Sequence, residues 1–73
     1  MNEITERTVT VNGRLLQTAA THLRDLLPEF GVTDDKTGVA VAVNRAVVPR
    51  ADWDRTRITA GDEIEIVNAV QGG

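Results

Sequence analysis

Polar and apolar residues alternate in two short runs near the beginning of the chain. Residues 8–11 (Thr-Val-Thr-Val) alternate as a half-buried strand does. Asn12-Gly13 follows, and both residues tolerate the positive φ angles of a tight type I′ turn. Residues 14–17 (Arg-Leu-Leu-Gln) continue as a returning strand. The pattern therefore predicts an antiparallel hairpin over residues 8–17.

A helical spacing of apolar residues comes next. Four of them lie at positions i, i+3, i+4 and i+7 and share one helix face: Leu23, Leu26, Leu27 and Phe30. Thr18 or Thr21 can cap the start of this helix, and Gly31 is a natural stop. Pro28 lacks a backbone donor and crowds the preceding turn. We therefore expect either a kink at Pro28 or a regular helix that ends near Leu27 with a looser last turn.

The next predicted strand is apolar throughout. Residues 39–43 (Val-Ala-Val-Ala-Val) are typical of a strand with little water on either face. Asn44-Arg45 should turn the chain after it. Because Arg45 stands where a tight turn favours glycine, we expect this turn to be wider or mildly strained.

Shorter elements complete the pattern. Residues 46–48 form a brief extended piece that Pro49 should interrupt. Residues 51–54 are long enough for a single helical turn. Residues 63–66 (Glu-Ile-Glu-Ile) alternate, so the two isoleucines should point inward while the two glutamates face water.

The order of these elements is strand, strand, helix, strand, short strand and strand. It fits the α+β class, and within it a ubiquitin-like β-grasp fold, in which one main helix packs across one face of a mixed four- to five-stranded sheet. A ferredoxin-like unit needs a second helix, for which residues 51–54 are too few. With 73 residues there is room for one domain, which we place at residues 1–69, followed by a flexible tail at residues 70–73 that ends in Gly-Gly. In so small a domain, most apolar positions should belong to the core.

Charge and composition narrow the classes of partner. Eight basic and eleven acidic residues give a net charge of −3, which does not favour a phosphate backbone and suits a basic protein partner. No apolar run approaches a membrane span, and the first residues are too polar for a signal peptide. The absence of cysteine is compatible with a reducing compartment. We expect a cytoplasmic protein that binds neither nucleic acid nor membrane.

Side chains suited to catalysis are scarce. The chain has no serine, cysteine or tyrosine, which excludes the serine and cysteine triads. The single histidine, His22, makes no metal site alone and is expected at the surface. Asp34-Asp35 lacks the spaced oxygen ligands of a calcium loop, and Lys36 is expected in the same solvated loop. This inventory predicts a protein that is not an enzyme and holds no metal or cofactor.

The pair Gly72-Gly73 is the remaining candidate for chemistry. A backbone without side chains can enter a narrow channel in a partner and adopt φ and ψ angles closed to other residues. A terminal glycine also leaves its carboxylate unhindered for attack on ATP. A frayed tail is the alternative explanation, since glycine is common there as well. At the end of a β-grasp domain, however, the pair indicates activation of the carboxylate.

From about Thr8 to Gly73 the sequence resembles the ThiS family, the sulfur carriers of thiamine (thiazole) biosynthesis. Three segments carry the likeness: residues 9–13 (Val-Thr-Val-Asn-Gly), residues 39–53, which include Val-Pro-Arg-x-x-Trp, and residues 61–73, which end in Ala-Val-Gln-Gly-Gly. Arg45 and Pro28 depart from the family pattern, as do about six residues before its usual start. None of these departures falls in the tail.

The resemblance implies a carrier that partner enzymes act upon. An adenylating enzyme of the ubiquitin-activating type would activate the Gly73 carboxylate with ATP and magnesium. Sulfur from a cysteine desulfurase would convert it to a thiocarboxylate, and thiazole synthase would accept that sulfur. Gly73 would be the covalent carrier, Gly72 would give access, and Val70 with Gln71 would guide the tail.

Two residues of the family pattern have no assigned task in this scheme. Trp53 is expected to pack under its loop rather than recognise a partner. For Arg50, contact with a partner and a solvated role remain equally open.

Three rival functions remain open. The nearest is another β-grasp carrier, such as the small subunit of molybdopterin synthase, which gene neighbourhood would distinguish. A ubiquitin-like modifier would form slower-migrating conjugates in cells. A plain binding module would keep its function after deletion of Gly73.

Overall fold

Five strands, one α-helix and two 3₁₀ turns lie in residues 5–33 and 35–68, which are the residues that the computed structural model describes. In chain order they are β1 (Arg7–Val11), β2 (Arg14–Thr18), α1 (Leu23–Leu26), η1 (Leu27–Phe30), β3 (Val39–Val43), β4 (Ala46–Val47), η2 (Arg50–Asp52) and β5 (Glu63–Asn68).

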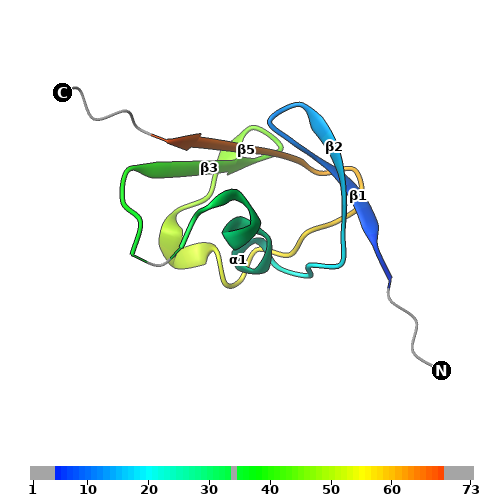
Figure 1. Ribbon diagram of the computed structural model, residues 1–73, viewed down its shortest axis with the longest axis horizontal. Helices are drawn as coiled ribbons and strands as arrows, with labels where there is room; N and C mark the ends of the chain where they lie inside the picture. Colours follow the sequence, from blue (N-terminus) through cyan, green and yellow to red (C-terminus); the bar gives the residue numbers. More distant parts are fainter. Residues whose placement is uncertain (1–4, 34, 69–73) are drawn as a thin grey trace.

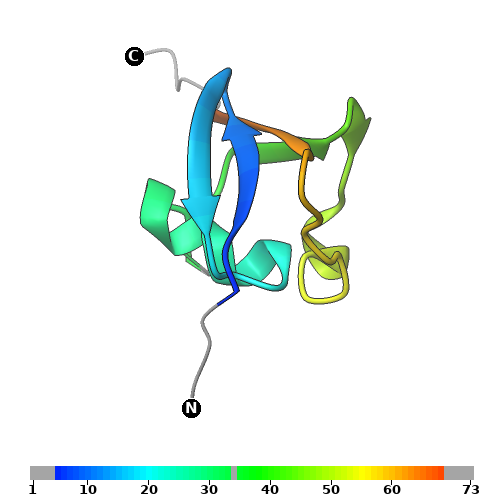
Figure 2. The same ribbon diagram turned by 90° about the vertical axis from the view of Figure 1, so that its right-hand side faces the viewer.

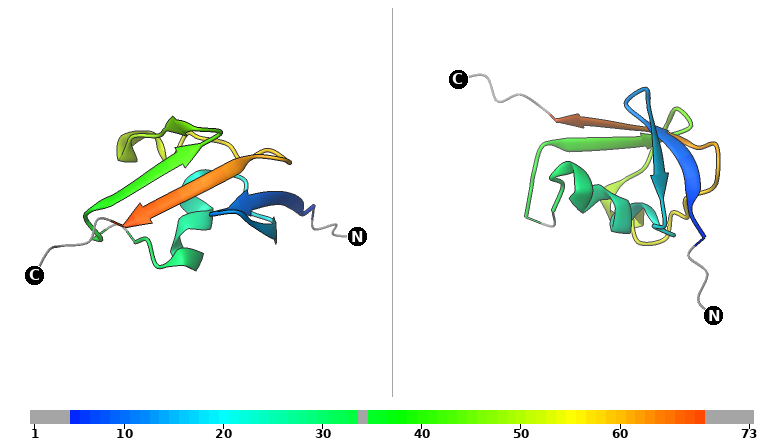
Figure 3. Two further views of the ribbon diagram at one scale, coloured as in Figure 1. Left: turned by 90° about the horizontal axis from the view of Figure 1, so that it is seen from above. Right: turned by 45° about the vertical axis from the view of Figure 1, so that its right-hand side comes forward.

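The strands form one mixed sheet in the order β2-β1-β5-β3-β4. Neighbouring strands are antiparallel except β1 and β5, which are parallel. β5, labelled in Figure 1, therefore occupies the centre of the sheet, and the left view of Figure 3 shows it between β3 and β1. α1 and η1 lie against one face of the sheet in each of the views (Figures 2 and 3). This arrangement confirms the predicted β-grasp fold.

The core fills the space between the sheet and the helix. Its members come from nearly every element: Val9, Val11, Leu23, Leu26, Leu27, Val32, Val41, Trp53, Ile58, Ile64 and Ile66. The predicted alternation of β5 is confirmed, since both isoleucines are buried and both glutamates are exposed. No helix in the described part of the chain is long and apolar enough to span a bilayer.

The hairpin of β1 and β2 follows the predicted pattern. Asn12 and Gly13 have φ angles of 52° and 83°, and Val11 pairs with Arg14 directly across the turn. Both angles lie in the left-handed region, as a two-residue turn between twisted antiparallel strands requires. The prediction of a hairpin from Asn-Gly is confirmed.

Pro28 ends the regular helix. α1 stops at Leu26, and η1 continues the same path as a 3₁₀ turn in which Pro28 is the second residue. Proline is tolerated there because the first turn of a helix leaves backbone N–H groups without intrahelical partners. Gly31 closes the segment at a φ of 79°. Of the two outcomes expected at Pro28, the shortened helix with a looser last turn is confirmed.

The prediction that Thr18 or Thr21 caps the start of the helix was wrong. The residue that precedes α1 is His22, and it makes no side-chain capping bond. The backbone N–H of Leu23 instead donates to the carbonyl of Thr56 at 2.8 Å, and that of Arg24 donates to the carbonyl of Trp53 at 3.2 Å. Carbonyl groups from a distant loop therefore satisfy N–H groups that a local side chain was expected to cap.

The prediction that Phe30 lies on the buried helix face was wrong. Its side chain is 39% exposed. The chain leaves its helical path at the left-handed Gly31, and Val32 then returns to the core. The N–H of Val32 donates to the carbonyl of Leu27 at 3.1 Å, which holds this reversal. Val32 thus takes the buried place that the helical spacing assigned to Phe30.

β3 was expected to have little water on either face, and this was wrong for one face. Val41 is buried against the helix side, but Ala40, on the opposite face, is exposed. α1 and η1 cover only one face of the sheet (Figure 3), and this explains the exposure of Ala40 on the other face. Most apolar residues belong to the core or pack against it, as expected, but three large ones on the open face are exposed: Leu15 (78%), Val47 (73%) and Val67 (60%).

The turn after β3 is tight. Val43 pairs with Ala46, so only Asn44 and Arg45 lie in the turn, with φ angles of 53° and 71°. The expectation of a wider turn was therefore wrong. The expected strain is present, because Arg45 carries a Cβ in the left-handed region. Beyond Pro49, the helical turn predicted at residues 51–54 exists as η2, which begins one residue earlier and ends two residues earlier than expected.

Candidate functional site

The residues that sequence reasoning assigned to sulfur transfer lie outside the described residues. These are Val70, Gln71, Gly72 and Gly73, together with the predicted boundary between the domain and its tail. The structure does describe the strand that leads to them. β5 runs through the middle of the sheet and ends at Asn68. The candidate site is therefore β5 and the groups that hold and surround it.

β5 has a buried face and two paired edges. Ile64 is 1% exposed and Ile66 is 7% exposed, so both anchor the strand in the core. On one edge, every residue of β3 pairs with β5, from Val43↔Ile64 to Val39↔Asn68. On the other edge, the parallel pairing with β1 covers only Thr10↔Glu63 and Val11↔Ile64.

The side chain of Asn12 extends the short pairing between β1 and β5. Its backbone N–H donates to the carbonyl of Ile64 at 2.9 Å. Its carboxamide then accepts from the Ile66 N–H at 2.8 Å and donates to the Ile66 carbonyl at 3.3 Å. Asn12 thus satisfies both backbone groups of Ile66, as a residue of a neighbouring strand would.

Asn44 makes a corresponding set of contacts on the other edge. Its backbone N–H donates to the carbonyl of Glu63 at 2.7 Å, and its side-chain oxygen accepts from the Glu63 N–H at 2.9 Å. Its side-chain nitrogen donates to the Asp62 carboxylate at 3.0 Å. The second oxygen of that carboxylate accepts from the N–H of Thr59 at 2.8 Å. The start of β5 is therefore fixed to the turn that precedes it.

Sequence reasoning recognised both asparagines as turn residues only. Nothing in the local pattern shows that either carboxamide reaches β5, because Asn12 and Ile66 are 54 residues apart. The one available signal is that each turn has asparagine first, where glycine would satisfy the backbone angles without any side chain.

The open face of the sheet carries apolar side chains beside β5. Val67 pairs with Ala40, and Val47 pairs with Ala42, so these four lie close together on two neighbouring rows. Glu65 also pairs with Ala42 and is exposed next to them. We call the group of Ala40, Ala42, Val47 and Val67 the open-face patch.

Trp53 belongs to the core, as expected. It is 3% exposed, and its indole Nε1 donates to the carbonyl of Val48 at 3.0 Å. The Arg50 guanidinium lies over the ring at 4.4 Å from its centre and donates to the carbonyl of Lys36. Arg50 therefore covers the indole and fastens the loop around Lys36, a role that sequence reasoning had left open.

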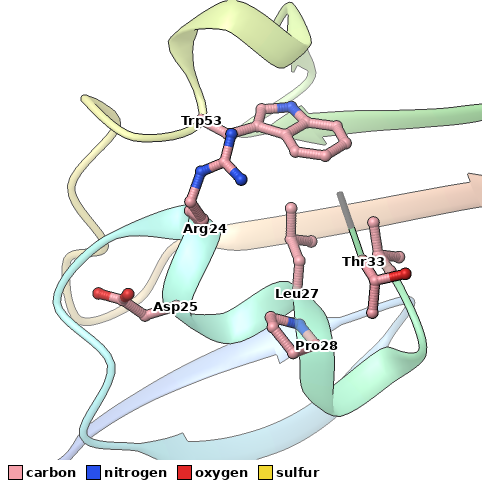
Figure 4. Close-up of a pocket in the computed structure, with 7 residues that line it drawn as sticks. Arg24, Asp25, Leu27, Pro28, Thr33 and Trp53 are labelled. Carbon is pink, nitrogen blue, oxygen red and sulfur yellow. The ribbon is translucent and has the colours of Figure 1, made fainter. Parts of the chain in front are cut away.

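A pocket of about 410 Å³ lies on the helix side of the sheet (Figure 4). Its wall combines apolar and polar groups: Arg24, Asp25, Leu27, Pro28, Val32, Thr33 and Trp53. Arg24 pairs with Asp54 at its rim, and both side chains are partly exposed. The pocket and the open-face patch therefore lie on opposite sides of the sheet.

Ionisable groups form no catalytic cluster among the described residues. His22 is partly exposed, bonds the Thr21 hydroxyl at 2.9 Å and lies 4.0 Å from Asp25. The hydrogen bond from the Thr33 hydroxyl lowers the pKa of the exposed Asp35 carboxyl, with smaller help from its own backbone N–H and from Lys36. No group of three or more potential metal ligands occurs in residues 5–33 and 35–68.

The fold and the site define a ubiquitin-like β-grasp domain whose central strand leads directly to the C-terminal residues. The sequence model of the ThiS family matches residues 5–73, and the chain belongs to that family. Membership in this family supports a sulfur-carrier role.

Two solved structures are similar over most of the chain. One is the crystal structure of a thiamine biosynthesis protein (ThiS) from Geobacter metallireducens, with 28% identity, a TM-score of 0.72, and coverage of 90% of this chain and 99% of that one. The other is an NMR structure of a thiamine biosynthesis protein from the same organism, with 28% identity, a TM-score of 0.70, and coverage of 90% and 87%. No curated protein matches the chain.

Proposed function

We propose that this chain is a sulfur carrier whose Gly73 carboxylate is converted to a thiocarboxylate that donates sulfur for thiazole synthesis. The observation that carries the proposal is that the ThiS family match extends through the Gly72-Gly73 end of the chain. The fold supports it, because β5 leads from the centre of the sheet towards that end.

The chemistry belongs to partner enzymes. An adenylating enzyme of the ubiquitin-activating type binds ATP and magnesium, and a carboxylate oxygen of Gly73 attacks the α-phosphorus and releases pyrophosphate. A persulfide supplied by a cysteine desulfurase then attacks the acyl carbon and displaces AMP. A thiol of the partner reduces the resulting acyl disulfide, which leaves the thiocarboxylate on Gly73 and a disulfide on the partner. Thiazole synthase accepts this sulfur.

The chain contributes access and docking rather than catalysis. Gly72 lets the backbone enter a narrow channel, because glycine adds no side-chain bulk there. Val70 and Gln71 guide the tail into that channel. The chain is thus a co-substrate in the cytoplasm, and ATP and magnesium are cofactors of its partner.

The open-face patch supports docking of the adenylating enzyme. The patch is apolar, all its members except the half-buried Ala42 are exposed, and it includes Val67, the penultimate residue of β5. Glu65 lies beside it, and the chain carries a net charge of −3. A partner surface with apolar side chains flanked by basic ones would complement both features. Docking there would place the partner next to the strand that ends in the tail.

Intact-mass spectrometry tests the proposed conversion. The purified chain is incubated with the adenylating enzyme, ATP, magnesium, a persulfide donor and a thiol, and we expect one oxygen to be replaced by sulfur. A variant with one bulky residue added after Gly73 serves as the control and should keep its mass. An unchanged mass of the native chain, with an enzyme that is active on another carrier, would refute the proposal.

The same product distinguishes the related carriers. The purified thiocarboxylate is offered separately to thiazole synthase and to the large subunit of molybdopterin synthase. We expect only thiazole synthase to return the chain to its carboxylate form. Consumption by the molybdopterin enzyme alone, or slower-migrating conjugates with lysine-containing proteins, would assign the chain to one of the other classes.

A further inference from the structure

β5 is held unequally along its two edges. In a strand, the backbone N–H and C=O groups of alternate residues point to opposite edges. In β5 the groups of Glu63 are bonded on the β3 side, while the carbonyl of Ile64 and both groups of Ile66 are bonded on the β1 side. β1 itself ends at Val11, level with Ile64. The part of β5 nearest the tail therefore has no backbone partner from β1.

Asn12 supplies the missing contacts. Its carboxamide bonds both backbone groups of Ile66, which lies two residues before the end of β5 at Asn68. Without these bonds, the final residues of β5 would be held through β3 alone. Asn12 is thus the last described connection between the hairpin of β1 and β2 and the end of β5 that leads into the tail.

Asn44 fixes the beginning of the same strand. It bonds both backbone groups of Glu63 and, through Asp62, is linked to the N–H of Thr59. These contacts lie at the other end of β5 and on its other edge. Together the two carboxamides resist a slip of β5 along the sheet in either direction.

A role in the turns explains why asparagine is accepted at both positions, but it does not explain why both carboxamides bond to β5. Both asparagines have left-handed φ angles, 52° at Asn12 and 53° at Asn44, which glycine adopts at no steric cost. Each carboxamide is directed away from its own hairpin partner strand and towards β5. The shared feature of the two positions is therefore the contact with the strand that carries the tail.

We infer that Asn12 and Asn44 are positioning residues for the chemistry at the C-terminus: they set the register of β5 and hence the point from which the tail enters a partner's active site. This inference rests on the proposed sulfur-carrier function. Loss of the Asn12 carboxamide should slow the reaction more than loss of the Asn44 carboxamide. Asn12 is bonded near the end of β5 that leads to the tail, whereas Asn44 is bonded at the start of the strand. A small displacement of the reacting carboxylate can slow a reaction by roughly a hundredfold.

Substitution by glycine isolates the carboxamides, because glycine preserves the turn angles. We expect Asn12→Gly to lower kcat for thiocarboxylate formation by about tenfold or more, with KM for the carrier changed by less than about twofold. Asn44→Gly should lower kcat less. Arg45→Gly, in the same turn as Asn44 but without a backbone contact to β5, should leave kcat unchanged. Amide exchange should accelerate at Ile66 in Asn12→Gly and at Glu63 in Asn44→Gly.

A variant of matched stability separates positioning from loss of folding. Ile58→Val trims a buried side chain outside β5, and it should retain the native kcat when assayed at the same distance below its thermal midpoint. An equal loss of kcat in Ile58→Val would overturn the inference. So would a native kcat in Asn12→Gly, or a rise confined to KM, which would mean that Asn12 contacts the partner directly. If the native chain takes up no sulfur, the proposed function fails, and this inference falls with it.

Discussion

Arg45→Gly should stabilise the protein, although it removes a charged side chain. Arg45 has a φ of 71° in a two-residue turn, and a residue with a Cβ in the left-handed region costs about 1–2 kcal/mol. Glycine removes that cost, but its greater freedom in the unfolded chain returns about 0.5–1 kcal/mol. The ion pair of Arg45 with Glu63 is long, at 3.9 Å, and highly exposed, so its loss should cost close to nothing.

The expected net gain is about 0.5–1 kcal/mol of unfolding free energy. In a domain of this size, that corresponds to a rise of roughly 2–8 °C in Tm. Trp53 is the only tryptophan and is buried, so its fluorescence reports unfolding in urea directly. The urea midpoint should rise while the dependence on urea stays unchanged, because the folded and unfolded surfaces are the same.

Asn44→Gly in the same turn provides the contrast. It relieves a similar left-handed angle but also removes the side-chain bonds to the Glu63 N–H and to Asp62, each contributing about 1 kcal/mol. We expect its Tm to fall while that of Arg45→Gly rises. A lower Tm for Arg45→Gly would refute the argument that the backbone of residue 45 is strained.

Substitutions at three further positions test other parts of the structure. Trp53→Phe should destabilise the fold by about 2 kcal/mol in urea unfolding followed by circular dichroism, because it leaves the Val48 carbonyl without its donor and a gap in the core; an unchanged midpoint would contradict this. Val67→Lys should raise KM for adenylation about tenfold, and the isosteric Val67→Thr should raise it less; equal KM values for the three chains would exclude docking there. Thr33→Val should raise the pKa of Asp35 towards its ordinary value, because it removes the largest cause of the lowering. In the native chain the lowered pKa contributes stability above the ordinary aspartate pKa, and this contribution is lost as pH falls through the folded value. The urea midpoint should therefore fall less on acidification from pH 6 to about pH 3 in the variant, and parallel curves would argue against it.

Local patterns predicted the elements whose cause is local. Asn12-Gly13 specifies its hairpin because the turn needs two positive φ angles, and both residues accept them. Gly31 ends the helical segment for the same reason. The alternation in β5 predicted its buried face, because strand side chains point to opposite faces in turn. The family likeness pointed to residues 70–73 as the reactive tail, and this stays a prediction, because those residues lie outside the described ones.

The errors arose where distant segments supply the contacts. No pattern near Leu23 shows that its N–H will meet the carbonyl of Thr56, so a threonine cap was the natural but wrong expectation. The helical spacing favoured Phe30 over Val32 because a periodic pattern carries no information about the reversal at Gly31. The apolar run of β3 likewise could not show that only one face of the sheet is covered.

By itself, then, the sequence determined the strand and helix order and the places of the two asparagine turns, because each depends on neighbouring residues. The tertiary structure alone decided how β5 is held. The contacts of Asn12 with Ile66 join residues far apart in the chain, and they exist only once the last strand has taken its place between β1 and β3. The position of β5 beside an open apolar face is likewise a product of sheet order, which is set by packing against the helix rather than by any local pattern.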